Sequence, residues 1–107
     1  MTHFTLHDLA AIIKSRAAAG GDKSYTRSLL DKGVAHCARK LGEEAIETVI
    51  AALEPDTDKL VGESADLLYH LLVLLEARGV SLADVEAKLA ARTGMSGHDE
   101  KQARQRE

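Results

Sequence analysis

The sequence predicts an all-α fold, and three observations support this. Apolar residues make up 45% of the 107 residues but aromatic residues only 3%, so a core has to be built from Leu, Val, Ile and Ala. Apolar residues recur at intervals of three and four, which is the period of one helix face. No segment alternates as a strand does, and there is no glycine-rich phosphate loop. We therefore expect a helical bundle of four main helices and a short helix.

The first helix is marked by the polar residues at its start. Thr5 can cap it, with Asp8 in the acidic position of a capping box. Glycine interrupts helices, so this helix should end near Gly20 and Gly21.

A polar loop, residues 22–26, leads to a short helix that should end at Gly33. Either Ser24 or Thr26 can cap this helix, because a hydroxyl oxygen accepts a hydrogen bond from a free N–H of the first turn. Hydroxyl and basic groups occur together here. The loop is therefore either an anion-binding segment or an ordinary solvated connection.

Two long helices follow, joined by a short connection around Pro55. The first of these two, which is the second long helix of the chain, should cover about residues 34–53, because the residue before a proline is pushed out of the helical conformation. The third should cover about residues 59–78, with Gly79 ending it.

Parts of these two helices, residues 45–53 and 67–75, are apolar around most of their circumference. A helix of this kind is normally buried, and a chain this small cannot cover both. We therefore expect a homodimer or a higher homo-oligomer.

Ser81 and Asp84 open a fourth helix, which should end near Arg92. Residues 1–92 are expected to form one all-α domain, and residues 93–107 a polar, mobile C-terminal tail.

Charge and cysteine content exclude several classes of protein. The net charge of −3 argues against general nucleic-acid binding, which needs a basic surface. Cys37 is the only cysteine, so neither an intrachain disulfide nor a cysteine-based zinc site can form, and we expect a buried thiol. There is no secretory signal and no apolar run of the roughly 20 residues that span a bilayer. We expect a soluble, cytoplasmic protein.

Two acidic pairs lie on the predicted second and third helices. Glu44 and Glu47 are three residues apart, as are Glu63 and Asp66, which places each pair on one helix face. If the connection around Pro55 makes the helices antiparallel neighbours, the four carboxylates can face one another. Like charges at this distance repel, which predicts a cation between them. Hard oxygen ligands without cysteine select Mg²⁺, with Mn²⁺ as a substitute.

Other interpretations of these acids remain open. Acidic pairs also occur on exposed helices, where they pair with lysines. Lys40, one turn before Glu44, can pair with that carboxylate or bind a phosphate. A di-iron centre is disfavoured because no Glu-x-x-His occurs. We interpret His70 as a hydrogen-bonded core or interface residue rather than a catalytic one.

Four segments carry a resemblance to a known family. They are residues 24–26 (Ser-Tyr-Thr), 40–47 (Lys-Leu-Gly-Glu-Glu-Ala-Ile-Glu), 63–70 (Glu-Ser-Ala-Asp-Leu-Leu-Tyr-His) and 92–97 (Arg-Thr-Gly-Met-Ser-Gly). In these segments the chain resembles the phosphoribosyl-ATP pyrophosphohydrolase family, within the all-α nucleoside-triphosphate pyrophosphatase (MazG-like) superfamily. The paired acids indicate the superfamily, whereas Ser-Tyr-Thr and the Tyr-His after the second pair indicate the family.

The resemblance implies Mg²⁺-dependent hydrolysis of the α–β phosphoanhydride of phosphoribosyl-ATP to phosphoribosyl-AMP and pyrophosphate, the second step of histidine biosynthesis. By motif position, the implied Mg²⁺ ligands are Glu44, Glu47, Glu63 and Asp66. Glu43 is then an accessory acid, and Glu44 or Glu47 is expected to accept the proton. The candidate contacts to phosphates or ribose are Ser24, Tyr25, Thr26, Lys32, Arg39 and Lys40. The chain lacks the length and the cysteines of a fused cyclohydrolase, so we expect the free-standing form.

Two rival functions account for part of the same sequence. A housekeeping pyrophosphatase acting on dNTPs would use the same acids, and a preference for phosphoribosyl-ATP over ATP would separate the two. A non-catalytic helical dimer would explain the apolar helices but not the acidic pairs.

Overall fold

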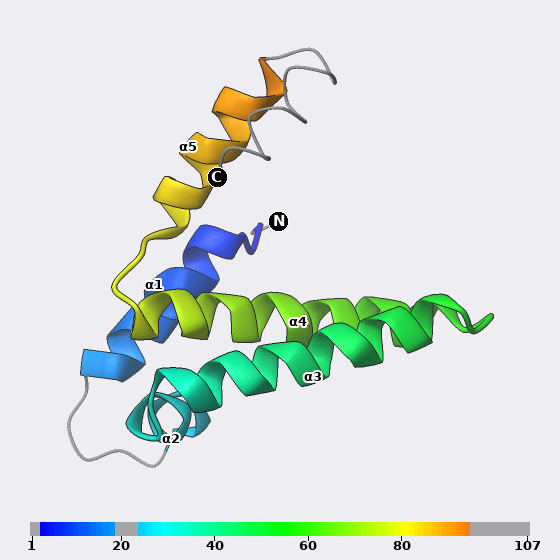
Figure 1. Cartoon of the computed structure of the whole chain (residues 1–107), viewed down its shortest axis with the longest axis horizontal. Helices are drawn as coiled ribbons and strands as arrows, with labels where there is room; N and C mark the ends of the chain where they lie inside the picture. The colour runs from blue at the N-terminus through cyan, green and yellow to red at the C-terminus, as the bar shows by residue number, and fades with distance from the viewer. Residues whose placement is uncertain (1–2, 19–23, 95–107) are drawn as a thin grey trace.

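The computed structural model of the chain describes residues 3–18 and 24–94, and every regular element within them is a helix. In order, the helices are α1 (Leu6–Ala18), α2 (Tyr25–Asp31), α3 (Val34–Ala52), α4 (Thr57–Ala77) and α5 (Leu82–Thr93). The predicted all-α fold is therefore confirmed. Figure 1 shows α3 and α4 side by side, α1 and α2 near one end of them, and α5 pointing away.

The first two helices begin at residues whose side chains accept hydrogen bonds from the first turn. The Thr5 N–H donates to Asp8 at 2.9 Å and the Asp8 N–H donates to the Thr5 hydroxyl at 3.1 Å, which is the reciprocal pattern of a capping box. Before α2, the Ser24 hydroxyl accepts from the Arg27 N–H at 3.0 Å. Of the two candidate caps for this helix, the structure thus selects Ser24.

Helix boundaries differ from the predicted ones by one to three residues. Helix α1 ends at Ala18, two residues before the predicted Gly20, and both glycines lie outside the described residues. Helix α4 begins at Thr57, before the predicted start, because Asp56 accepts hydrogen bonds from two N–H groups of the first turn. Helix α5 includes Thr93, which the sequence analysis places in the tail; residues 95–107 of that tail lie outside the described part.

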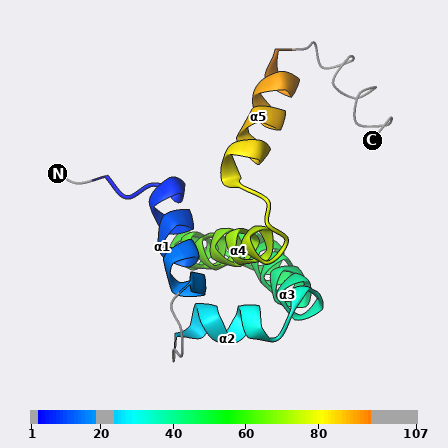
Figure 2. The same ribbon diagram turned by 90° about the vertical axis from the view of Figure 1, so that its left-hand side faces the viewer.

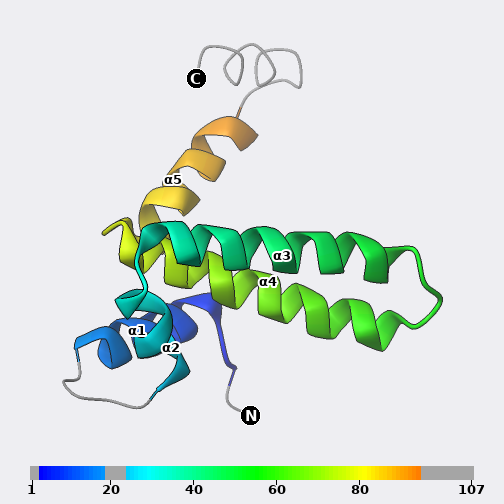
Figure 3. The same cartoon turned by 60° about the horizontal axis from the view of Figure 1, so that its bottom comes forward.

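Helices α3 and α4 form an antiparallel hairpin with the most extensive helix contact in the structure (Figure 3). Only residues 53–56 connect the two helices, and this short connection returns the chain directly alongside itself. The hairpin therefore fixes which residues of α3 face α4.

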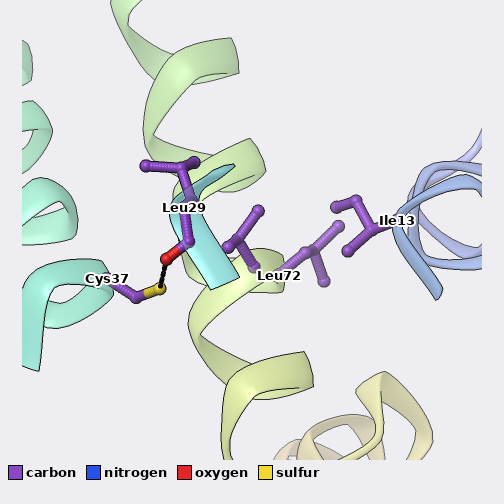
Figure 4. Packing of buried hydrophobic residues seen from close by; sticks show 5 residues of the cluster. Ile13, Leu29, Cys37 and Leu72 are labelled. Atoms are coloured by element: carbon purple, nitrogen blue, oxygen red, sulfur yellow. Dashed lines mark hydrogen bonds between the residues drawn. The ribbon is translucent and has the colours of Figure 1, made fainter. Parts of the chain in front are cut away.

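The apolar core lies at the end of the hairpin where α1 and α2 pack against it. Ile13 from α1, Leu29 from α2, Cys37 from α3, and Leu72 and Val73 from α4 are each at most 5% exposed. Figure 4 shows these side chains meeting, with the Cys37 thiol donating to the Leu29 carbonyl at 3.3 Å. Burial raises the pKa of the Cys37 thiol. Cys37 is therefore a small apolar residue of the core, in agreement with its interpretation from the sequence.

Helix α5 contacts this core through its first residue, Leu82, and then extends away from it. Figure 2, which looks along the hairpin, shows α1 and α2 around its end while α5 extends away. A contact at 2.8 Å between His7 of α1 and Glu86 of α5 links the two helices, and both side chains are exposed. None of the helices in the described residues combines the length and hydropathy needed to cross a membrane.

Gly33→Ala should lower the free energy of unfolding by about 1–3 kcal/mol. Gly33 precedes α3 with φ 95° and ψ 171°, a region almost confined to glycine. Gly42→Ala inside α3 is the matched control, because an added Cβ meets open space at both glycines. The control should be stabilised by up to about 1 kcal/mol. Urea unfolding at one protein concentration measures both, and effects of the same sign would contradict this account.

Candidate active site

The acidic pairs of α3 and α4 converge on the hairpin. Glu44 of α3 and Glu63 and Asp66 of α4 each offer a carboxylate oxygen, and these three atoms all lie within 4.8 Å of one another. The antiparallel packing explains the arrangement, because Glu44 lies about as far before the connection as the other two lie after it. We call these three residues the acidic group.

The surroundings of Glu44 disfavour the charged form of its carboxylate. Its pKa is raised, first because burial removes water from the carboxylate, and then because Glu47 adds negative charge and a hydrogen bond. Asp66 also raises this pKa, and His70 opposes it. Within the described residues, the Glu44 Oε2 atom is buried and lacks a hydrogen-bond partner. Such an oxygen is costly to bury alone, and a bound cation would stabilise it.

The two remaining acids of the α3 motif have different surroundings. Glu47 is exposed and lies beside Glu44, but it is not part of the acidic group. Glu43 faces the basic side chains instead, accepting from Lys40 at 3.2 Å and lying 4.0 Å from Arg39. Lys40 is thus paired with Glu43 rather than Glu44, and this hydrogen bond raises the Lys40 pKa.

The acidic group has the chemistry of a site for a hard divalent cation. Its three donors are carboxylate oxygens, with no sulfur or nitrogen among them, which favours Mg²⁺ or Mn²⁺. Mg²⁺ usually takes few protein carboxylates and completes its coordination with water and phosphate oxygens. The unpaired Oε2 of Glu44 is a ready donor for such an ion. The residues therefore fit the ion that the sequence predicts.

A hydrogen-bonded aromatic cluster attaches α2 to α4 one turn after Asp66. His70 Nδ1 donates to the Asp66 carbonyl at 2.8 Å, because a carbonyl only accepts. The Tyr25 hydroxyl lies 3.4 Å from the His70 Nε2. The hydroxyls of Thr26 and Tyr69 are hydrogen-bonded to each other. His70 is 6% exposed, so its interpretation as a hydrogen-bonded core residue is confirmed.

The three loop residues predicted to contact a ligand differ in accessibility. Tyr25 is 54% exposed, and its hydroxyl points to the cluster next to the acids. Thr26 has 0% of its surface exposed, so in this structure it holds α2 on α4 and offers no surface to a ligand. The Ser24 hydroxyl caps α2. Tyr25 is therefore the loop side chain best placed to meet a ligand.

Positively charged side chains lie along the start of α3. Lys32 precedes the helix, and Arg39 and Lys40 follow about two turns later, before Glu44. Arg39 donates to His36 Nδ1 at 3.1 Å. The pKa of His36 is lowered, first by partial desolvation and then by the positive charge of the neighbouring lysines and arginine. A phosphorylated ligand that reached the acidic group along α3 would pass these groups.

Two residues near the site are not among the sequence predictions. His36 lies four residues from Lys32 and from Lys40, and this helical spacing is the signal that could have indicated it. Thr48 places its hydroxyl 2.8 Å from the Glu44 carbonyl and 3.2 Å from the Glu63 carbonyl. The second contact depends on how α3 and α4 align, so no local sequence signal predicts it.

Comparison with known proteins identifies relatives of this chain. A family profile described as phosphoribosyl-ATP pyrophosphohydrolase (PRA-PH) matches residues 6–93. The chain belongs to the phosphoribosyl-ATP pyrophosphohydrolase family. The match runs from the first residue of α1 to the last residue of α5, so the family profile covers all five helices described. The resemblance found in the sequence is thereby confirmed.

Curated relatives in this family are similar over their whole length. The chain is 67% identical to a phosphoribosyl-ATP pyrophosphatase of Nitrobacter winogradskyi, over 100% of this chain and 92% of the relative. It is 64% identical to the protein of that name in Nitrobacter hamburgensis, over 100% of both chains. It is 61% identical to phosphoribosyl-ATP pyrophosphatase 1 of Rhodopseudomonas palustris, again over 100% of both.

Glu44→Gln should stabilise the metal-free protein at pH 8 by about 0.5 kcal/mol, because it removes a desolvated charge beside like charges. The raised Glu44 pKa means that ionisation of this group opposes folding. The gain should therefore be present well above the ordinary carboxyl pKa of 4.5 and vanish below it, where Glu44 is protonated in both states. Unfolding in EDTA at both pH values measures this effect.

The matched control is Glu43→Gln, the same substitution at the preceding residue of α3. That substitution removes a carboxylate paired with Lys40, so it should leave stability unchanged or slightly lowered at pH 8. A Glu44→Gln protein less stable than the control at pH 8 would contradict the electrostatic account.

Proposed function

We propose that this protein hydrolyses the α–β phosphoanhydride of phosphoribosyl-ATP, giving phosphoribosyl-AMP and pyrophosphate in the second step of histidine biosynthesis. The observation that carries the proposal is the acidic group, with the unpaired Oε2 of Glu44 within it. Family membership and relatives named phosphoribosyl-ATP pyrophosphatase supply the substrate. A polyanionic substrate does not cross membranes unaided, so we place the reaction in the cytoplasm.

The proposed cofactor is Mg²⁺, with Mn²⁺ as a substitute, held by Glu44, Glu63 and Asp66. When bound, the ion offsets the negative charge of the phosphate oxygens, which otherwise protects a phosphoanhydride from attack. Glu47 lies beside Glu44, outside the acidic group, and can complete the ligand set. Four carboxylates near one point would give the site a strong preference for a doubly charged ion over Lys or Arg side chains.

Hydrolysis adds water across the anhydride, so the protein has to orient the phosphate chain and remove one proton. Lys32, Arg39 and Lys40 are proposed to hold phosphate oxygens, since they line α3 on the approach to Glu44. The exposed ring of Tyr25 is proposed to contact the ribose or the base. A carboxylate with an oxygen that does not bind the cation takes the proton from water. Glu47 and Glu44 are the two candidates for this role.

The decisive experiment measures pyrophosphate release by the purified protein from phosphoribosyl-ATP, ATP and dCTP, with Mg²⁺ and with EDTA. We expect release from phosphoribosyl-ATP alone, abolished by EDTA. Comparable release from ATP and dCTP would instead indicate a housekeeping nucleotide pyrophosphatase. No release from any of the three would overturn an enzymatic role.

Asp66→Asn should reduce kcat for phosphoribosyl-ATP by about 100-fold or more, because the substitution removes a charge that holds the cation while keeping the side-chain size. Glu47→Gln should also impair Mg²⁺-dependent turnover. Glu54→Gln is the control, since Glu54 lies after α3 in the hairpin connection and pairs with Lys59. Full activity of Asp66→Asn would remove this residue from the proposed site.

We also propose that the protein is a homodimer formed through the end of α3. Four large apolar side chains there are more than half exposed: Ile46, Val49, Ile50 and Leu53. Their spacing of three and four residues places them on one face of the helix. The radius of gyration is 16.0 Å, against about 12–13 Å for a compact domain of this size, so much surface is left to be covered. A second copy presents the same apolar face and can cover it symmetrically.

Replacing Ile46 and Leu53 together with lysine should convert the dimer to a monomer, because two charges would have to be desolvated in the interface. Leu89→Lys is the control, since Leu89 is an exposed apolar residue on α5 rather than on this face. Sedimentation equilibrium of the three proteins gives their masses. An unchanged mass for the double variant would show that the dimer, if formed, uses another surface.

A further inference from the structure

The Thr48 side chain connects the two helices that carry the acidic group. Its hydroxyl lies 2.8 Å from the Glu44 carbonyl in the same helix and 3.2 Å from the Glu63 carbonyl in α4. Both carbonyls belong to residues whose carboxylates are in the acidic group. One hydroxyl therefore contacts the backbone of a ligand residue on each side of the hairpin.

The chemistry of the contact defines what Thr48 can do. A hydroxyl has one proton, so it donates to the two carbonyls in a shared hydrogen bond, and each carbonyl keeps a lone pair for its own helix. Bonding from threonine to the carbonyl four residues earlier is common and by itself means little. The second acceptor, on the neighbouring helix, is the unusual feature. Thr48 is half-buried, so water competes weakly for these acceptors.

The contact constrains the alignment of α3 relative to α4. Apolar side chains at a helix interface pack over a range of positions, because dispersion contacts have little directional preference. A hydrogen bond with an oxygen donor is directional and is usually about 2.5–3.0 Å long, so the 3.2 Å contact to the Glu63 carbonyl is already at the long end and further separation breaks it. Sliding of one helix along the other would lengthen the Thr48 contact and separate Glu44 from Glu63.

We propose that Thr48 is a positioning residue that fixes the spacing of Glu44 against Glu63 and Asp66 through the Glu44 and Glu63 backbone carbonyls. This inference rests on the proposed function, because it concerns the proposed metal site. In this role Thr48 acts through the backbone of the two ligand residues and is not itself a metal ligand. Its loss therefore weakens metal binding by letting the acidic group spread.

The test compares Thr48→Val, which keeps the shape but removes the hydroxyl, with Thr48→Ser, which keeps the hydroxyl but removes the methyl group. Thr93→Val is the control, because the Thr93 hydroxyl also donates to a carbonyl of its own helix, at 3.0 Å, but lies on α5. Mn²⁺ alone is titrated into each full-length protein, and binding is followed by electron paramagnetic resonance. The midpoint of thermal unfolding is measured alongside.

Thr48→Val should weaken Mn²⁺ binding by about tenfold, as loss of a residue that orients a ligand typically does. Thr48→Ser should bind within about twofold of the wild type, and Thr93→Val should be unchanged. A role in packing alone predicts the reverse order, with the serine variant less stable and the valine variant binding normally; that result would overturn the inference. If Thr48→Val does not fold, Thr48→Ala replaces it in the comparison with serine.

The same experiment distinguishes failure of this inference from failure of the proposed function. If the wild type and Thr48→Val bind Mn²⁺ equally well, the positioning role is wrong but the proposed metal site is retained. Absence of Mn²⁺ binding in the wild type overturns the metal site itself, and with it the proposed function and this inference.

Discussion

Close antiparallel packing of α3 on α4 is the constraint on which both the core and the site depend. It brings Glu44 to Glu63 and Asp66, whose negative charges disfavour the same arrangement. Repulsion between like charges on helix surfaces is worth a few tenths of a kcal/mol per pair, whereas each fully buried leucine or valine contributes about 1.5–3 kcal/mol. Apolar packing near Cys37 and Leu72 therefore outweighs the repulsion. The hairpin holds the carboxylates together before any cation arrives.

Local signals in the sequence predicted most of the fold. Capping residues such as Thr5 and Asp8 act within one helical turn, so their effect is readable from neighbouring positions, and the helix starts agree within two residues. The direction of α5 was not predicted, because it depends on contacts between distant residues such as His7 and Glu86. A bundle of four main helices was expected, but α5 extends away from the other helices.

For the candidate site, the sequence predicted which acids could meet but not how each one is used. Helical spacing placed Glu43, Glu44 and Glu47 near one another on α3, and it could not show that Glu43 turns to Lys40 while Glu44 turns to α4. That division depends on which arc of α3 is covered by α4. Ser24 and Thr26 were equivalent candidate caps in the sequence, and they are distinguished by the hydrogen bond that Ser24 accepts from the Arg27 N–H and by the burial of Thr26.

The order of side chains along α3 gives each part of this helix a different task. Its first half carries Arg39 and Lys40, and its middle carries the acids. The exposed apolar face begins among the acids at Ile46 and continues through Val49 and Ile50 to Leu53, the residue that follows the helix. Cations and acids at neighbouring positions would neutralise each other if they were all paired. Glu43 does pair with Lys40, and among the described residues the Oε2 of Glu44 has no hydrogen-bond donor.

This separation of charge has a physical reason. A divalent ion binds most tightly to carboxylates that are not already paired with a lysine or arginine of the protein. Phosphate oxygens, in turn, bind best to lysine and arginine side chains that are not fully paired with carboxylates. Placing one acid between the two groups, as Glu43 is placed, keeps Lys40 oriented without occupying the acidic group. In the proposed metal site, the raised pKa of Glu44 would be a property of the metal-free protein, and binding of the ion would offset the cost of burying this carboxylate. The apolar packing that tolerates this cost is thus what makes the acidic group suitable for a cation.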